Sequence, residues 1–347
     1  MRSLWAVMFV AACGRVDFVP LGDGGSASGV DSPNGEHRIR LDLDRYTPIG
    51  PVDDLALRVS LDSSRFPRQD ARSDLSDLRF ELDGATLDYE IDAVDPVPEI
   101  WVHVPTVTGS PIYLYFGGQV QPASASVWSD SYIGVWHLDT ADDSSPRQNN
   151  GAVTASTGTT GEIGPGLSVS GTGYVAIAAQ SSTNWTSGHV TVSAWIRSEA
   201  FPSDAYATIV GRENGNGGAD DFALGYASDL SVACDLVTGP DTNPSTDKIT
   251  LNQWAHIAMT YDGANQIIYV DGTERLRTPA TGALAQSNNP IHFGADSNSA
   301  PPTTPDGEFV VGRIDEVRLD SAARTAAWIG ADYASQSDAW ITYGPVE

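Results

Sequence analysis

Two loops of the sequence place carboxylate and amide side chains at spacings that could hold a calcium ion. The first loop spans residues 142–151 and the second spans residues 294–306. Calcium takes several oxygen ligands from Asp, Asn and backbone carbonyl groups, commonly on flexible loops. The sequence therefore predicts calcium as a cofactor, and ordinary Asx turns are the alternative, because Asp and Asn also favour turns. The expected ligands in these loops are Asp143, Asn150, Asp296, Asn298 and Asp306.

Catalysis by paired carboxylates is the other chemistry that the residues could support. Glycoside cleavage needs two carboxylates on either side of one bond, roughly 5 Å apart or more. Asp315 and Glu316 are neighbours in an expected strand, so their side chains should point to opposite faces. Glu90 and Asp92 do share a face, but they lie in the N-terminal part of the chain, where a solvated strand face is the favoured interpretation. We therefore expect no enzyme, and a glycoside hydrolase or lyase is the weaker alternative.

Composition and charge restrict the kinds of partner that the chain is expected to bind. Its 347 residues include 45 acidic and 19 basic side chains, for a formal net charge of -26. The electric field of so negative a protein repels phosphate backbones and anionic lipid surfaces, so we do not expect nucleic acid as a partner. The 34 glycines and 21 prolines favour many short strands joined by turns over long amphipathic helices.

The N-terminal residues indicate export. Arg2 precedes the apolar run 4–10, which is far too short to span a bilayer. The following residues, Val-Ala-Ala-Cys at positions 10–13, resemble a bacterial lipobox. This resemblance implies a signal peptide over residues 1–13, lipidation of Cys13 and an outer-membrane or surface address, with the membrane contacted only through the lipid. A plain secretory signal is the alternative, and residues 14–36 are an expected flexible linker.

Only Cys234 then remains as a thiol, so the sequence predicts no internal disulfide and a buried cysteine in a strand.

Residues 37–118 predict a small β-sandwich. Segments such as 38–43 and 55–61 alternate apolar and polar residues with a period of two, and turn residues separate them. The segments 78–91, 100–105 and 112–117 resemble an uncharacterised bacterial domain that often precedes a jelly roll in secreted proteins. No activity is established for that family. Residues 119–130 are an expected linker.

Residues 131–347 predict a second, larger all-β domain. The segments Val192–Ile196, Trp254–Gly263, Ile268–Gly272 and Gly312–Leu319 occur in an order that resembles the concanavalin A-like, laminin-G-like jelly-roll superfamily, which includes the pentraxins. This resemblance implies two antiparallel sheets packed face to face. A short helix is expected at 322–333, followed by a possible closing strand at 340–343. The residues expected to point into the core are Trp195, Trp254, Ile257 and Val317.

The resemblance also implies positions for ions and ligands. In relatives, the loop matched by Asp143 can share an ion with the acidic strand matched by Asp315, and the loop at Asp296 resembles the calcium loop of pentraxins. Residues 213–214 and 220–221 could face that second loop. A sugar ring could stack on loop aromatics, although core packing is the alternative for each of them. These candidate ligand-binding aromatics are Trp185, Tyr206 and Tyr226.

Together these features predict an exported cell-envelope protein that recognises an extracellular glycan or protein through a calcium-supported jelly roll. An adhesive surface module that binds only protein is the first alternative, and a hydrolase is the second. The oligomeric state stays open.

Overall fold

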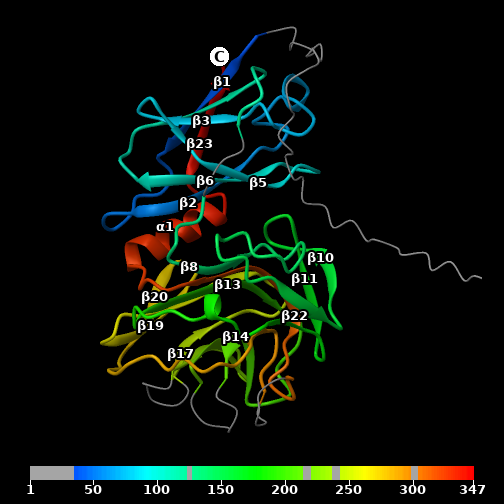
Figure 1. Cartoon of the computed structure of the whole chain (residues 1–347), viewed down its shortest axis with the longest axis vertical. Helices are drawn as coiled ribbons and strands as arrows, with labels where there is room; N and C mark the ends of the chain where they lie inside the picture. Colours follow the sequence, from blue (N-terminus) through cyan, green and yellow to red (C-terminus); the bar gives the residue numbers. More distant parts are fainter. Residues whose placement is uncertain (1–34, 123–126, 214–219, 237–242, 298–303) are drawn as a thin grey trace, which may run out of the picture.

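The computed structural model describes residues 35–122, 127–213, 220–236, 243–297 and 304–347. These residues form two β-sandwiches stacked along the long axis of the molecule, with helix α1 (Ala326–Gln336) between them (Figure 1). The expectation of an all-β chain, with a small sandwich before a larger jelly roll, is confirmed. No helix in the described ranges combines the length and the apolar character needed to cross a membrane.

The smaller sandwich pairs a five-stranded sheet with a three-stranded sheet among the described residues, and neighbouring strands are antiparallel. The first sheet has the order β23-β1-β7-β3-β4, with β1 (His37–Leu43), β3 (Arg79–Leu82), β4 (Ala85–Leu87), β7 (Ile112–Phe116) and β23 (Ile341–Val346). The second has the order β2-β6-β5, with β2 (Asp53–Ser60), β5 (Tyr89–Ala93) and β6 (Glu99–Thr106). A 3₁₀ turn, η1 (Arg68–Asp70), lies between β2 and β3.

Strand β1 shows how the alternating pattern produces this sandwich. Ile39 and Leu41 are fully buried, whereas Arg38 and Arg40 between them are exposed. Successive side chains of a strand point to opposite faces, so one face enters the core and the other meets water.

The end of the chain returns to the smaller sandwich. Strand β23 pairs with β1, and Tyr343 lies opposite Leu41. All of residues 131–347 were expected in the jelly roll, but this last strand is hydrogen-bonded to a sheet of the smaller sandwich. The physical reason is that β1 would otherwise present an edge of unpaired backbone groups, which β23 covers. Trp340, just before β23, is fully buried and meets Tyr46 edge to face at 5.5 Å.

The jelly roll consists of two larger antiparallel sheets within the described residues. One has the order β10-β11-β22-β13-β18-β19-β20, with β8 also paired to β22. Its strands are β8 (Tyr132–Trp136), β10 (Thr157–Thr160), β11 (Pro165–Ser170), β13 (Val190–Ser198), β18 (Ala255–Tyr261), β19 (Asn265–Val270), β20 (Thr273–Pro279) and β22 (Val311–Asp320).

The other sheet has the order β17-β16-β15-β14-β21-β12-β9. Its strands are β9 (Gly151–Thr154), β12 (Tyr174–Ile177), β14 (Tyr206–Arg212), β15 (Phe222–Ala227), β16 (Ser231–Asp235), β17 (Asn243–Lys248) and β21 (Ile291–Phe293). The 3₁₀ turn η2 (Ser181–Thr183) connects β12 to β13.

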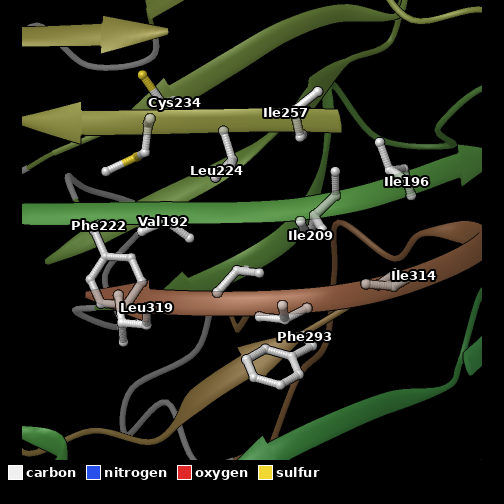
Figure 2. Packing of buried hydrophobic residues seen from close by; sticks show 14 of the residues in the cluster. Val192, Ile196, Ile209, Phe222, Leu224, Cys234, Ile257, Phe293, Ile314 and Leu319 are labelled. Carbon is white, nitrogen blue, oxygen red and sulfur yellow. The ribbon is translucent and has the colours of Figure 1, made fainter. Parts of the chain in front are cut away.

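Apolar side chains from both sheets fill the space between them (Figure 2). Ile257 and Val317 belong to this core, as expected, and Cys234 is also buried there. Trp195 does not belong to it, and the expectation for this residue is wrong. Its neighbours on β13 take the inward positions, so Trp195 points outward, where its Nε1 donates a hydrogen bond of 2.7 Å to Gln336 Oε1 of helix α1. Trp254 is half-buried and precedes β18.

The three-stranded sheet of the smaller sandwich is covered on both faces. Leu55 packs inside the smaller sandwich, whereas Ala56 and Trp101 pack against Trp128 and Val135 of the chain that enters the jelly roll. Figure 1 shows β2, β5 and β6 beside α1 and β8. The two sandwiches therefore share a buried interface.

Helix α1 closes one side of this interface. It begins after Thr325, whose Oγ1 accepts a hydrogen bond of 3.2 Å from Trp328 N, so the helix starts later than the expected residue 322. Ser335 near its end accepts a hydrogen bond of 2.7 Å from Arg58 N of β2. The helix thus ties the jelly roll to the smaller sandwich.

Candidate metal centre

Three carboxylates meet on the sheet that lies far from the smaller sandwich. Glu213 follows β14, Asp220 precedes β15, and Asp296 follows β21. Strand β14 pairs with both β15 and β21 and so brings these three segments together. One potential ligand oxygen from each side chain lies within 4.8 Å of the other two. We call this group the carboxylate triad.

The loop after β21 is held closed around Asp296. The backbone of this residue exchanges hydrogen bonds of 3.0 and 3.1 Å with Gly307, and Asp306 N donates to Asp296 O at 3.0 Å. Asp306 therefore supports the loop through its backbone. Asn298, the other ligand expected here, lies outside the described residues.

The triad is largely shielded from water. Glu213 is 2% exposed and Asp296 is 6% exposed. Glu213 Oε1 accepts a hydrogen bond of 2.5 Å from Ser297 N, but Oε2 has no hydrogen-bond partner among the described residues. Burial raises the pKa of Asp296 to about 7, and the charges of Glu308 and Asp306 act in the same direction.

The chemistry of these donors fits a hard cation. All three side chains offer oxygen, which Ca²⁺ prefers, and the buried Oε2 of Glu213 lacks the partner that a buried charge needs. A bound divalent cation would satisfy this oxygen and relieve the mutual repulsion that otherwise favours protonation. The residues present therefore fit calcium.

A small pocket adjoins the triad through Asp220. Its volume is about 60 Å³, and its floor is formed by small residues of β15 and β16, namely Ala223, Gly225 and Ala233. Such a volume holds a few water molecules, since one water needs roughly 10–15 Å³, and it is far below the roughly 300 Å³ of a full small-molecule site. A protruding hydroxyl or similar group of a larger ligand would fit.

The three aromatics expected to bind ligand differ in their surroundings. Tyr206 is half-buried and lines the pocket, which residue Tyr226 also borders. Tyr226 is 1% exposed and Trp185 is 7% exposed, and both pack in the core between the sheets. Trp185 Nε1 also donates to His189 O at 2.8 Å. Neither ring offers a free face to a sugar, so the expectation fails for these two because inward strand and loop positions favour large apolar groups.

Asp143, the first-loop residue expected to bind a metal, is bound by the backbone of its own loop. Asp143 Oδ1 accepts hydrogen bonds from Val135 N at 2.9 Å and Ser145 N at 2.8 Å, and Oδ2 accepts from Asn149 N at 2.6 Å. Asn150 Oδ1 accepts from Asp143 N at 2.9 Å. This bonding is typical of an Asx turn, the alternative named above.

Asp315 makes a similar set of contacts on β22. Its Oδ2 accepts from Ile163 N at 2.8 Å and its Oδ1 from Glu316 N at 3.0 Å. The metal role of Asp143, Asn150 and Asp315 stays a prediction.

A second group of possible metal ligands lies between the sandwiches and was missed by sequence reasoning. It consists of Asp92, His137 and Glu316, and one potential ligand atom of each side chain lies within 4.8 Å of those of the other two. The Asp92 side chain is only 5% exposed, so the expectation of a solvated strand face is wrong for this residue. The shared face of Glu90 and Asp92 was visible in the sequence, but no local pattern shows that a second domain covers it.

Residues 169–330 match the family described as the concanavalin A-like lectin/glucanases superfamily. No curated protein matches the chain in sequence. Domain 4 of AbnA, an extracellular GH43 arabinanase from Geobacillus stearothermophilus solved with arabinotriose, is 18% identical, with a TM-score of 0.46 over 59% of this chain and 98% of that domain.

Two structures of binding domains are similar to the same degree. The binding domain of Paraclostridial Mosquitocidal Protein 1 is 13% identical, with a TM-score of 0.46 over 59% of this chain and 52% of that one. The binding domain of Botulinum Neurotoxin DC in complex with SialylT is 15% identical, with a TM-score of 0.46 over 60% of this chain and 51% of that one. The chain thus spans about half the length of these two structures.

Residues 169–330 thus match the concanavalin A-like lectin/glucanases superfamily in sequence, and the two antiparallel sheets with a shared apolar core agree with this match.

Proposed function

We propose that the chain is an exported cell-envelope protein that binds an extracellular glycan or protein through its jelly roll. The proposed site is the carboxylate triad with a calcium ion, together with the adjoining pocket. The observation that carries the proposal is the buried Oε2 of Glu213, which has no hydrogen-bond partner among the described residues although Asp220 and Asp296 are close by. When bound, calcium would neutralise the carboxylate triad.

The surroundings of the pocket support ligand recognition. Tyr206, Glu308 and Asp235 are among the residues that line it. Glu308 Oε2 accepts a hydrogen bond of 2.7 Å from Thr208 Oγ1, which fixes the carboxylate beside the pocket. An aromatic ring next to oriented carboxylates suits a hydroxyl-rich ligand, because the ring covers an apolar face and the carboxylates accept hydrogen bonds.

Binding is favoured over hydrolysis by the position of the only same-face acidic pair that the sequence suggested. Asp92 is buried against His137 between the sandwiches, and Glu90 accepts hydrogen bonds from Trp128 Nε1 at 2.6 Å and Ser144 Oγ at 2.7 Å. A substrate bond could not lie between these two carboxylates without separating the sandwiches. We propose, accordingly, that the chain is not an enzyme.

Export and lipid attachment at Cys13 belong to the same proposal. Cys13 lies outside the described residues, and the support for its role is the lipobox-like segment 10–13. Replacement by Cys13→Ser should abolish incorporation of a labelled fatty acid in a bacterial host. Unchanged labelling would contradict the assignment.

The decisive experiment is thermal unfolding of the chain with calcium and then with a chelator. Ligand binding to the native state stabilises it by about 2.7 kcal/mol when calcium is present at one hundred times its Kd. We expect Glu213→Gln to abolish the calcium-dependent rise in Tm. Glu274→Gln on exposed strand β20 is the matched control and should retain the rise.

Two further variants separate the possible outcomes. If Asp143→Asn abolished the calcium-dependent rise in Tm and Glu213→Gln did not, the ion would lie in the first loop. If the unmodified chain showed no rise in Tm at millimolar calcium, the metal site would be refuted. Calcium-dependent glycan-array binding that is lost in Tyr206→Ala would support glycan recognition. Capture of a protein partner without competition by sugars would favour the adhesive alternative.

A further inference from the structure

A buried group of charged side chains joins the two sandwiches. Asp92 comes from β5 of the smaller sandwich, His137 follows β8, and Glu316 comes from β22 of the jelly roll. His137 Nδ1 lies 2.7 Å from Glu316 Oε1 and 4.0 Å from Asp92 Oδ2. The side chain of His137 is 6% exposed, that of Glu316 is 0% exposed and that of Asp92 is 5% exposed. We call these three residues the interface triad.

The backbone directs Glu316 toward this point. Strand β22 has an irregular register opposite Ser193 and Trp195, and Glu316 there has a φ of 49°. An extra residue in one strand of an antiparallel pair re-aims the side chains beside it. Asp315 can therefore bind Ile163 N while Glu316 reaches His137 from the adjacent position.

Other groups orient the interface triad from outside. His137 Nε2 is buried, has no hydrogen-bond partner among the described residues and faces Glu90 Oε2 at 3.9 Å. Arg318 Nη2 donates to the second oxygen of Glu316 at 3.0 Å, and Arg318 Nη1 donates to Asp332 at 2.8 Å. A histidine that binds a metal with one nitrogen normally directs the other toward a carboxylate, which is the arrangement of His137 and Glu90.

Negative charge exceeds positive charge in this enclosed space. Asp92, Glu316, Glu90 and Asp332 surround the two cations His137 and Arg318, and Arg318 is already engaged by Glu316 and Asp332. The nearest cationic atom to the Asp92 carboxylate among the described residues is His137 Nδ1, at 4.0 Å. Burial of such a carboxylate is costly unless a cation compensates it.

We propose that Asp92, His137 and Glu316 bind one divalent transition-metal ion of the zinc class between the two sandwiches. An imidazole nitrogen with carboxylate oxygens is a donor set that zinc accepts, whereas calcium takes oxygen ligands.

The geometry needs only small adjustment. Zinc with bond lengths near 2.1 Å separates neighbouring tetrahedral ligands by about 3.4 Å. The separations of 2.7 and 4.0 Å at His137 Nδ1 lie on either side of that value. The ion would replace the hydrogen bond between His137 Nδ1 and Glu316 Oε1, releasing its proton to solvent, and would bring Asp92 into direct contact. It would thereby connect the two domains, independently of the calcium proposed on the far sheet.

The test uses the full chain, freed of metal with a chelator and titrated with zinc chloride by calorimetry. Millimolar calcium is present throughout to occupy sites that contain only oxygen. We expect one equivalent of zinc, an affinity at least ten-fold lower in Asp92→Asn and His137→Gln, and no change in Asp296→Asn, the control in the carboxylate triad. Cobalt(II) should give a visible absorption band that the first two variants lose.

A milder variant guards against loss of folding. Glu90→Gln alters only the carboxylate that faces His137 Nε2 and should weaken zinc binding about 10–100-fold, as substitutions of such partners do. Absence of stoichiometric zinc, or zinc binding that Asp92→Asn and Glu90→Gln leave unchanged, would overturn the proposal. Equal sensitivity of zinc binding to Asp296→Asn would also overturn it, because the ion would then lie in the carboxylate triad.

Discussion

The carboxylate of Asp54 links the two sandwiches, and its protonation should weaken the protein in acid. Asp54 Oδ2 accepts hydrogen bonds of 2.8 Å from Arg324 Nη2 and from Ser129 Oγ, and Oδ1 lies 3.2 Å from His103 Nε2. Burial alone would raise the pKa of Asp54, but these bonds from His103, Arg324 and Ser129 outweigh it and lower the pKa from 3.8 to about 2.

The size and sign of the effect follow from this shift. A fall from 3.8 to about 2 corresponds to at most about 2.4 kcal/mol of native-state stability, at roughly 1.36 kcal/mol per pKa unit. The Asp54 side chain is 30% exposed, so screening by solvent reduces the expected contribution to about 1–2 kcal/mol. Because the folded pKa is the lower one, the contribution is complete above about pH 5, roughly half lost by pH 3, and absent below about pH 1.

The assay is urea unfolding of Asp54→Asn and of the unmodified chain between pH 3 and pH 7, followed by tryptophan fluorescence. The variant should be less stable by about 1–2 kcal/mol at pH 7, and the difference should narrow toward pH 3. Asp53→Asn is the matched control, because this neighbouring side chain is exposed and its carboxylate bonds only Thr106 among the described residues. A pH-independent difference, or an equal loss in Asp53→Asn, would refute the reasoning.

Two other predictions concern buried residues of the two domains. Trp340→Ala should destabilise the protein by about 3–5 kcal/mol in urea unfolding, because Trp340 is fully buried just before β23. A loss of stability below about 1 kcal/mol would show that this side chain does not hold β23 in place. Cys234 is buried, and burial raises the pKa of its thiol, so it should not react in the native state. In a Cys13→Ser chain, a maleimide should label no cysteine before unfolding and one cysteine after it, as counted by mass spectrometry. Rapid labelling of the native chain would contradict the packing of β16.

The carboxylate triad was partly predictable from the sequence. The loop at Asp296 resembles a known calcium loop, and the segment after Arg212 was expected to face it; the structure brings Glu213, Asp220 and Asp296 together as that expectation required. The aromatics were less predictable, because the sequence does not show whether a residue near a strand points into the core. Tyr206 and Tyr226 both line the pocket, but Tyr206 is half-buried whereas Tyr226 is 1% exposed and packs between the sheets.

By itself, the sequence determined the all-β character of the chain and the two sandwiches, because alternation of apolar and polar residues is a local property that sets which face of each strand is buried. Only the tertiary structure decided where β23 pairs, which face of β13 receives helix α1, and that Asp92 meets His137 and Glu316. These contacts join residues far apart in the chain, and they depend on how one domain docks on the other. Docking depends on the complementarity of whole surfaces, which no short pattern of residues records.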